Sequence, residues 1–308
     1  MPRFFVQGVR QQHPLQLLQG DAMRPTHYPQ KPQQGFSLVE ILISLVIGLV
    51  VVGAVLVSYV GSGQTTKLQA AYADMNENAQ IGLAMLSKDI QLAGYANATA
   101  ADPVTGLFIR NAVPRSVFGC DNGFVATNAS AAATCSLVAG SPAIEVIYEA
   151  DLRNTVPRAV SGVNTPTDCL GNALVIGGGG FYTAYNRYYI ANSSSGRSEL
   201  HCASWGQIGQ PLIENVEAIK FWYGETTAVD RHIERYVTAG NLADVSFGNV
   251  VSVRICLLMR SPEPARSAEE GALTYLDCDS ATQTNAAGDL AARRAYFTTV
   301  TLRNKMSL

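Results

Sequence analysis

The feature that most constrains this chain is an apolar run without any charged side chain, which extends from Ile41 to Thr66. A helix rises about 1.5 Å per residue, so this run is long enough to exceed the roughly 30 Å hydrocarbon core of a bilayer. The sequence therefore predicts one membrane-spanning helix.

The flank before the run is basic. Only one acid, Asp21, opposes four cations, which are Arg3, Arg10, Arg24 and Lys31. Basic flanks of a first membrane helix remain in the cytoplasm, so the chain after Val60 is predicted to be exported. The exported part is net acidic, and it shows no basic patch of the kind that binds nucleic acid.

All of the cysteines lie in the exported part. An even number there suits three disulfides formed in an oxidising periplasm. Six cysteines allow many connectivities, and we favour pairing of sequence neighbours because each such pair flanks a turn-rich stretch. The expected pairs are Cys120 with Cys135, Cys169 with Cys202, and Cys256 with Cys278.

Three interpretations of the apolar run compete. A cleaved secretory signal has a core of about 7–15 residues and a small-residue cleavage site, and this run is longer and lacks a clean A-x-A pattern. A plain membrane anchor accounts for the length but not for Glu40, an acid at the start of the run. The third interpretation depends on "QGFSLVE", in which a polar leader ends at Gly35, the apolar segment begins at Phe36, and Glu40 follows four residues later.

This pattern resembles the N-terminal signal of type IV prepilins and pseudopilins. The resemblance implies that prepilin peptidase cuts between Gly35 and Phe36, that the new N-terminal residue Phe36 is methylated, and that the helix stays on the protein. A carboxylate in hydrocarbon is costly unless it is paired. The resemblance therefore implies that Glu40 pairs with the Phe36 amine of a neighbouring subunit. Leaders of this family are often shorter, and we expect Met23 to be the true start.

The helix is predicted to continue beyond the membrane. Apolar residues recur at spacings of three and four, which forms one stripe that would pack on a globular domain, or else bind a separate helix. Glycines at 61 and 63 mark a weak point where the helix can bend or melt, and Gly94 is expected near its end. The stripe consists of Leu68, Tyr72, Met75, Ala79, Leu83, Leu86 and Ile90.

Strand signals dominate the C-terminal half, whereas residues 97–142 read as loop structure. Alternating or aromatic-rich β-prone segments occur at 143–149, 181–191, 216–223, 249–259 and 295–302. The expected fold is α+β: a long pilin-like N-terminal helix, membrane-spanning in its first half, packed on a disulfide-linked antiparallel sheet. The expected parts are a leader (1–35), a membrane or pilus-core helix (36–62), an amphipathic helix (63–97) and a periplasmic sheet domain (98–308).

Signals of catalysis or cofactor binding are weak. His201 beside Cys202 lacks a metal-ligand spacing, and "DCDS" (277–280) lacks the remaining ligands of a calcium loop. "GGGG" (177–180) lacks the lysine of a phosphate loop and reads as a turn. We therefore expect no enzyme, no cofactor and no metal.

Several C-terminal stretches narrow the family. "SKDIQLAGY", "PLIENVEAIKFWYGE", and the pair "NVVSVRICLLMRS" and "RRAYFTTVTLRNK" resemble segments of PilW-type minor pilins. The resemblance implies an inner-membrane protein that moves to the pilus tip and starts assembly with other minor pilins, the major pilin and a tip adhesin. Alternatives are a J-type pseudopilin of type II secretion, an anchored surface-binding module that uses the aromatics of 181–189, and an anchored periplasmic enzyme.

Overall fold

A computed structural model describes residues 35–104, 108–111, 113, 115–226, 232–242, 244–265 and 273–305. The leader, with the expected start at Met23, lies outside the described residues. The chain divides into two compact units, one ending at Leu56 and the other beginning at Val57. Each unit is considered by itself.

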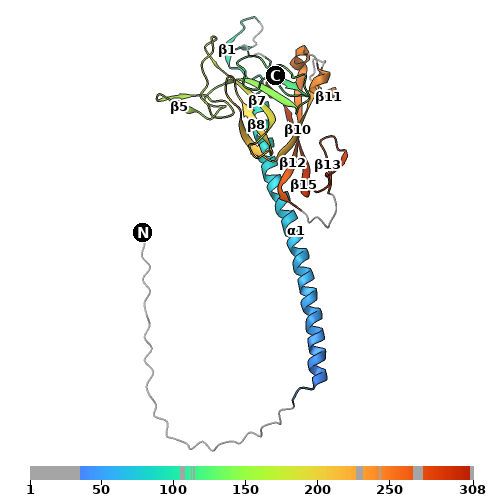
Figure 1. The fold of residues 1–308 in the computed structure, drawn as a ribbon. Helices are drawn as coiled ribbons and strands as arrows, with labels where there is room; N and C mark the ends of the chain where they lie inside the picture. Colours follow the sequence, from blue (N-terminus) through green and yellow to red (C-terminus); the bar gives the residue numbers. More distant parts are fainter. Residues whose placement is uncertain are drawn as a thin grey trace, which may run out of the picture. The chain divides into compact units, whose positions relative to one another are not determined.

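One helix, α1 (Leu38–Leu92), is continuous through both glycines of the expected weak point (Figure 1). The helix therefore does not melt at residues 61–63, whereas a bend there is not tested by this continuity. The hydroxyls of Thr65 and Thr66 donate to the carbonyl oxygens of Gly61 (3.2 Å) and Ser62 (3.0 Å), one turn earlier. The helix continues there despite the roughly 1 kcal/mol that each glycine costs in a helix interior.

The end of α1 follows the expected pattern. Gly94 adopts the left-handed conformation, with φ 71°, in which a helix commonly terminates. Its N–H donates to the carbonyl of Ile147 at 2.9 Å, and the N–H of Tyr95 returns to the carbonyl of Leu92 at 2.8 Å. The helix end is thereby joined directly to a strand.

Two principal antiparallel sheets form the globular unit, where the sequence suggested one. The first has the order β3-β4-β7-β8-β9, and the second has the order β11-β10-β12-β15. The first comprises β3 (Val117–Cys120), β4 (Ala143–Ala150), β7 (Tyr182–Asn192), β8 (Ser198–Ala203) and β9 (Gln210–Glu214). The second comprises β10 (Val216–Glu225), β11 (Arg235–Val237), β12 (Val250–Pro264) and β15 (Ala291–Thr301).

The globular unit also contains smaller sheets and short helices. Each of three two-stranded sheets is a hairpin, and short 3-10 helices lie near the C-terminal strands. Because β1, β2 and β3 fall within residues 97–142, the expectation of a structureless stretch there is only partly right. These elements are β1 (Ala98–Ala101), β2 (Phe108–Arg110), β5 (Arg158–Val160), β6 (Val163–Thr165), β13 (Thr274–Leu276), β14 (Thr282–Thr284), η1 (Ala239–Asn241), η2 (Asp244–Asn249) and η4 (Arg303–Lys305).

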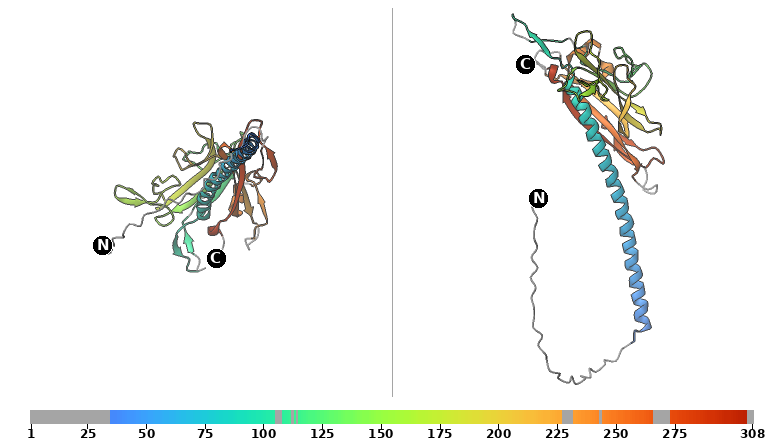
Figure 2. Two further views of the ribbon diagram at one scale, coloured as in Figure 1. Left: turned by 90° about the horizontal axis from the view of Figure 1, so that it is seen from below. Right: turned by 90° about the vertical axis from the view of Figure 1, so that its left-hand side faces the viewer.

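The C-terminal part of α1 lies against the sheets (Figure 2). One hydrophobic core joins this part of the helix to both sheets. The predicted stripe faces this core: Met75, Ala79, Leu86 and Ile90 are buried, and its other members pack at the rim. The α+β fold expected from the sequence is confirmed. Gly82 lies on the same face, where a Cβ would meet the side chains of Leu257 at 3.2 Å and Ile213 at 3.3 Å.

Alternation along β12 separates two faces. Its residues Val251, Val253, Ile255, Leu257 and Met259 are buried, as the pattern predicted. Cys256 points to the other face, where it forms a small cluster with Leu258 and Cys278. The structure contains three disulfides, each between sequence neighbours: Cys120–Cys135, Cys169–Cys202 and Cys256–Cys278.

Candidate functional site

The N-terminal segment presents the predicted processing residues at the start of α1. Gly35 and Phe36 precede the helix, and Phe36 is 80% exposed. Glu40 lies in the first turn, where a negative charge is favoured by the helix dipole. Among the described residues, no ion pair or side-chain hydrogen bond involves the carboxylate of Glu40. The carboxylate of Glu40 therefore has no hydrogen-bonding or ionic partner within the described part of its own chain.

The first unit exposes an apolar surface on every side of the helix. The large apolar side chains of α1 and its preceding residues from Phe36 to Leu56 are all more than half exposed, and the most apolar window has a mean hydropathy of 3.0 with none of it buried. By length and composition this helix can cross a membrane. Exposed apolar surfaces of this extent mark contacts with lipid or with other proteins.

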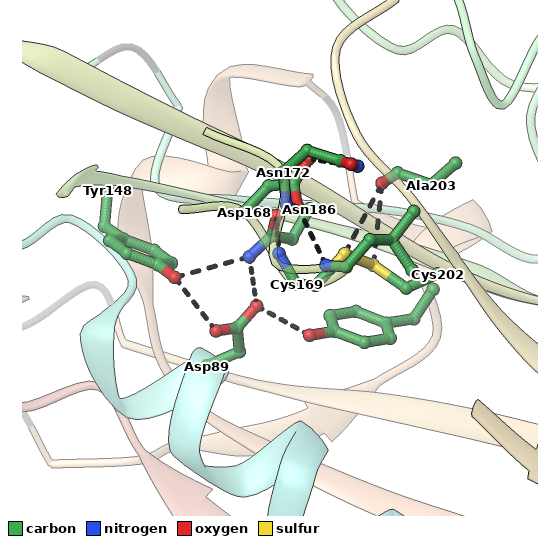
Figure 3. The surroundings of a disulfide bond; sticks show 10 residues. Asp89, Tyr148, Asp168, Cys169, Asn172, Asn186, Cys202 and Ala203 are labelled. Carbon is green, nitrogen blue, oxygen red and sulfur yellow. Dashed lines mark hydrogen bonds between the residues drawn. A yellow bond between two sulfur atoms is a disulfide. The ribbon is translucent and has the colours of Figure 1, made fainter. Parts of the chain in front are cut away.

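A second acid on α1, Asp89, is buried in the globular unit. Figure 3 shows its carboxylate held by donors from β4 and β7. The Tyr148 hydroxyl donates at 3.1 Å, the Asn186 amide at 2.6 Å and the Tyr188 hydroxyl at 2.7 Å. Three charge-assisted hydrogen bonds thus join the helix to the five-stranded sheet. We call these four residues the Asp89 network.

Burial shifts the proton affinities within the Asp89 network. Desolvation raises the pKa of Asp89, against the lowering effect of its three hydrogen bonds. The pKa of the Tyr148 hydroxyl and that of the Tyr188 hydroxyl are both raised, first by burial and then by the negative charge of Asp89. Both tyrosines are therefore firmly protonated donors.

Asn186 links the Asp89 network to a disulfide. While its amide donates to Asp89, its carbonyl oxygen accepts a hydrogen bond from the N–H of Cys169 at 3.1 Å. Cys169 is bonded to Cys202 on β8, beside the network in Figure 3. The helix, the central strand β7 and the segment around Cys169 are therefore positioned together.

The opposite side of β7 carries a buried ion pair. The Arg187 Nε donates to Glu145 on β4 at 2.8 Å, and both side chains are fully buried. The remaining guanidinium nitrogens donate to the main-chain oxygens of Thr127, Ala129 and Ala131. A buried cation with this many partners is well compensated. It fixes the path of the loop between Cys120 and Cys135.

Residues that the sequence singled out for metal or phosphate chemistry have structural contacts. His201 lies 3.3 Å from Glu199, and Asp277 accepts hydrogen bonds from the N–H groups of Asp279 and Ala281 within a turn. The run of glycines at 177–180 forms the turn that the sequence predicted, with the N–H of Gly180 donating to the carbonyl of Gly177. Within the described residues, no group of three or more potential ligands could hold a metal ion.

Sequence reasoning missed both the Asp89 network and Arg187. The available signal was Asp89 itself, because it stands beside Ile90 on the apolar stripe in "SKDIQLAGY". A carboxylate at a buried helical position predicts donors on the facing element. Which strands supply those donors depends on pairings that no local pattern reveals.

A long apolar helix with an acid in its first turn, followed along the chain by an antiparallel sheet domain, is the organisation of pilin-like proteins. Comparison with known families gives two matches. The prokaryotic N-terminal methylation motif matches residues 30–56, which include Gly35, Phe36 and Glu40. Type IV Pilus-assembly protein W, or PilW, matches residues 187–304, from within β7 to η4.

Together these matches support a PilW-like type IV minor pilin. Pilin families are structural proteins rather than enzymes, and the methylation motif implies processing by a peptidase and assembly with other pilus components. The signal and the apolar helix support a membrane-anchored pilin. No curated protein and no solved structure matches the chain.

Proposed function

We propose that this protein is a minor pilin that starts type IV pilus assembly at the tip, together with other minor pilins and an adhesin. The observation that carries the proposal is the unpaired Glu40, one turn after Phe36 on a helix whose apolar surface is exposed. The PilW match to residues 187–304 supports the minor-pilin part.

The proposed role of Glu40 follows from the cost of an isolated charge in hydrocarbon. A carboxylate at membrane depth costs about 2.5–3.5 kcal/mol on insertion scales, and a paired cation offsets this cost. Cleavage after Gly35 would create a positive amine on Phe36. Since Glu40 has no partner among the described residues of its own chain, we assign the amine of an adjacent subunit as its partner.

We propose a location for each part of the chain in the order of the sequence. The basic leader keeps the N-terminus in the cytoplasm, the first half of α1 crosses the inner membrane, and the sheet domain folds in the periplasm. Three disulfides agree with an oxidising compartment. Assembly would then carry the protein from the membrane to the tip of the pilus.

The first experiment measures the mass of the protein made with and without prepilin peptidase. We expect a product that begins at methylated Phe36 when the peptidase is present, and an uncut precursor when it is absent. An identical, uncut mass in both preparations would contradict the proposal, since no free amine would then exist at Phe36.

The second experiment separates the charge of Glu40 from its shape. Glu40→Gln keeps the size and removes the charge, so we expect incorporation into sheared pili to fall at least as far as it does for Glu40→Ala. Glu77→Ala, an exposed acid on the same helix, is the matched control and should enter pili normally. Normal incorporation of Glu40→Gln would refute the pairing.

The alternative is a J-type pseudopilin of type II secretion, since pseudopilins share the N-terminal signal. Capture of the mature protein from crosslinked membranes distinguishes the two machines. Minor pilins and a tip adhesin should accompany it if it belongs to a pilus, whereas secretion pseudopilins would identify the other machine.

A further inference from the structure

A cavity of about 340 Å³ opens beside the end of β8, away from the residues considered for assembly. One wall is the segment from Asp168 to Gly177, and the other is formed by β7 and the turn at residues 204–207. Its volume is at the lower end of the range of roughly 300–1,000 Å³ that is typical of ligand pockets. All of its lining residues belong to the described part of the chain.

Two aromatic rings form the apolar part of the cavity. Tyr185 on β7 and Trp205 after β8 lie with their ring centroids 4.3 Å apart and their planes at 47°. Although Tyr185 covers one side of it, Trp205 remains 38% exposed. Exposed tryptophan is uncommon, because its large apolar surface is normally buried at a core or an interface. An open indole in a cavity is therefore available for a ligand to stack on.

Polar groups surround these rings without partners of their own. In the described structure, the Thr183 hydroxyl, the Gln207 amide and the Trp205 indole N–H make no intramolecular hydrogen bond. The side-chain Nδ2 of Asn172 donates to Asp168, and the side-chain Oδ1 of Asn172 accepts no hydrogen bond within the described residues. The cavity therefore combines hydrogen-bond donors and acceptors with an aromatic surface, which is the combination that binds a sugar ring by its hydroxyls and its apolar C–H face.

The charge of the cavity limits the class of ligand. Its lining contains one acid, Asp168, and no lysine, arginine or histidine. A phosphate, sulfate or uronate would find no cation there, and would be repelled by Asp168. The lining therefore disfavours anionic polymers and suits a neutral ligand.

The walls are held in place before any ligand arrives. The disulfide Cys169–Cys202 joins the Asp168–Gly177 segment to β8 (Figure 3). The Asp168 carboxylate accepts hydrogen bonds from the N–H groups of Leu170 and Asn172. On the other wall the N–H of Gln207 closes a turn to the carbonyl of Ser204. A preformed site loses little conformational entropy on binding.

We propose that this cavity binds a neutral glycan, with one hexose unit stacked on Trp205 and its hydroxyls bonded to Thr183, Asn172 and Gln207. The proposal concerns the purified protein and does not depend on membership of a pilus. Its failure would leave the proposed function intact.

The chain contains two tryptophans, Trp205 and Trp222, which makes the test specific. In the full-length Trp222→Phe variant, Trp205 is the sole indole, and in Trp205→Phe it is Trp222. Each variant is kept in a detergent without a sugar headgroup and titrated with maltohexaose, cellohexaose, N-acetylchitohexaose and heparin. We expect a saturable change in emission of Trp222→Phe with at least one neutral glycan, and no change in Trp205→Phe.

Two further substitutions test the polar and aromatic contacts. In the Trp222→Phe background, Tyr185→Ala and Gln207→Ala should each weaken binding of the responding glycan several-fold. Gln210→Ala, an exposed residue on β9 outside the cavity, is the matched control and should bind normally. Circular dichroism checks that each variant is folded.

The outcomes decide the matter. No response to any of the three neutral glycans, an equal response from Trp205→Phe, or stronger binding of heparin than of every neutral glycan would each overturn the proposal. A Trp205 response that appears only with purified partner pilins would assign the cavity to a protein contact instead, which also overturns it.

Discussion

The two ends of α1 carry an acid each, and the two acids have opposite surroundings. Glu40 lies on an exposed apolar surface with no side-chain partner in the described chain, whereas Asp89 is buried and accepts three hydrogen bonds. Both carboxylates would be costly if left alone in an apolar environment. Folding supplies the partners of Asp89, while those of Glu40 have to come from outside the described chain.

This difference separates two functions of one helix. The second half of α1 is part of a folded core, so its polar contacts contribute to the stability of the monomer. Among the described residues of the first unit no side chain is buried, so under the proposed function Glu40 contributes to contacts with other molecules. Substitutions along α1 should therefore divide into those that change unfolding and those that change assembly.

The largest expected effect on stability comes from Asp89→Ala. Removal of the carboxylate leaves the hydroxyls of Tyr148 and Tyr188 and the amide of Asn186 buried without their acceptor, which we expect to cost about 3 kcal/mol of unfolding free energy. Urea unfolding of the full-length protein in detergent measures this cost. A loss of less than about 1 kcal/mol would mean that the Asp89 network does not hold the helix to the sheet.

Loss of the disulfide next to the Asp89 network is the next largest. The double variant Cys169→Ser with Cys202→Ser opens a loop with a sequence separation of 33, and should cost about 3 kcal/mol or somewhat less, chiefly by freeing the unfolded chain. The same unfolding experiment measures it. The control is Cys256→Ser with Cys278→Ser, whose separation of 22 predicts a slightly smaller loss.

A third prediction concerns pH. Since burial raises the pKa of Asp89, the folded protein binds its proton more tightly than the unfolded chain does. The contribution of Asp89 to stability is therefore full below the unfolded pKa of about 3.9 and is lost as pH rises through the raised folded pKa. Relative to Asp89→Asn, the wild type should gain stability as pH falls through that window, by at most about 1.4 kcal/mol per pH unit.

Paired urea unfolding curves of the wild type and Asp89→Asn at several pH values check this sign. All other acids are common to the two proteins, so the difference between their unfolding free energies isolates Asp89. A difference that grows in the wild type's favour as pH rises would reverse the conclusion and indicate that hydrogen bonds to the carboxylate outweigh its desolvation.

The smallest effect on stability is expected from Glu40→Gln. Because Glu40 is exposed and its carboxylate has no hydrogen bond or ion pair among the described residues, the unfolding free energy of the variant should differ from that of the wild type by no more than about 0.5 kcal/mol, while its incorporation into pili falls. This combination would complete the contrast with Asp89. If Glu40→Gln clearly destabilised the isolated protein, the contrast between Glu40 and Asp89 would be refuted.

Much of the fold was predictable because its signals are local. The apolar run and the stripe through Met75 and Ile90 predicted α1, and alternation along 249–259 predicted β12 and its buried face. The signal at Gly35, Phe36 and Glu40 was likewise visible, since its residues are adjacent in sequence. Their proposed roles in cleavage and charge pairing remain predictions.

The division into two sheets, the Asp89 network and the cavity beside Trp205 could not be predicted in this way. Each depends on contacts between residues far apart in the chain, such as Asp89 with Tyr188 or Arg187 with Glu145. Residues 57–186 lie outside both family matches, and within them only "SKDIQLAGY" offered a resemblance. At residues 61–63 a local signal was misleading: the two glycines predicted a weak point in the helix, yet α1 is continuous there.

The contacts of Arg187 have a consequence for how the domain tolerates change. Its guanidinium holds the loop near Ala129 through main-chain oxygens, which every amino acid possesses. The side chains of that loop take no part in these hydrogen bonds to Arg187. Its outer surface is therefore free to diversify between strains while the backbone keeps the same course, provided that one arginine and its acid are retained.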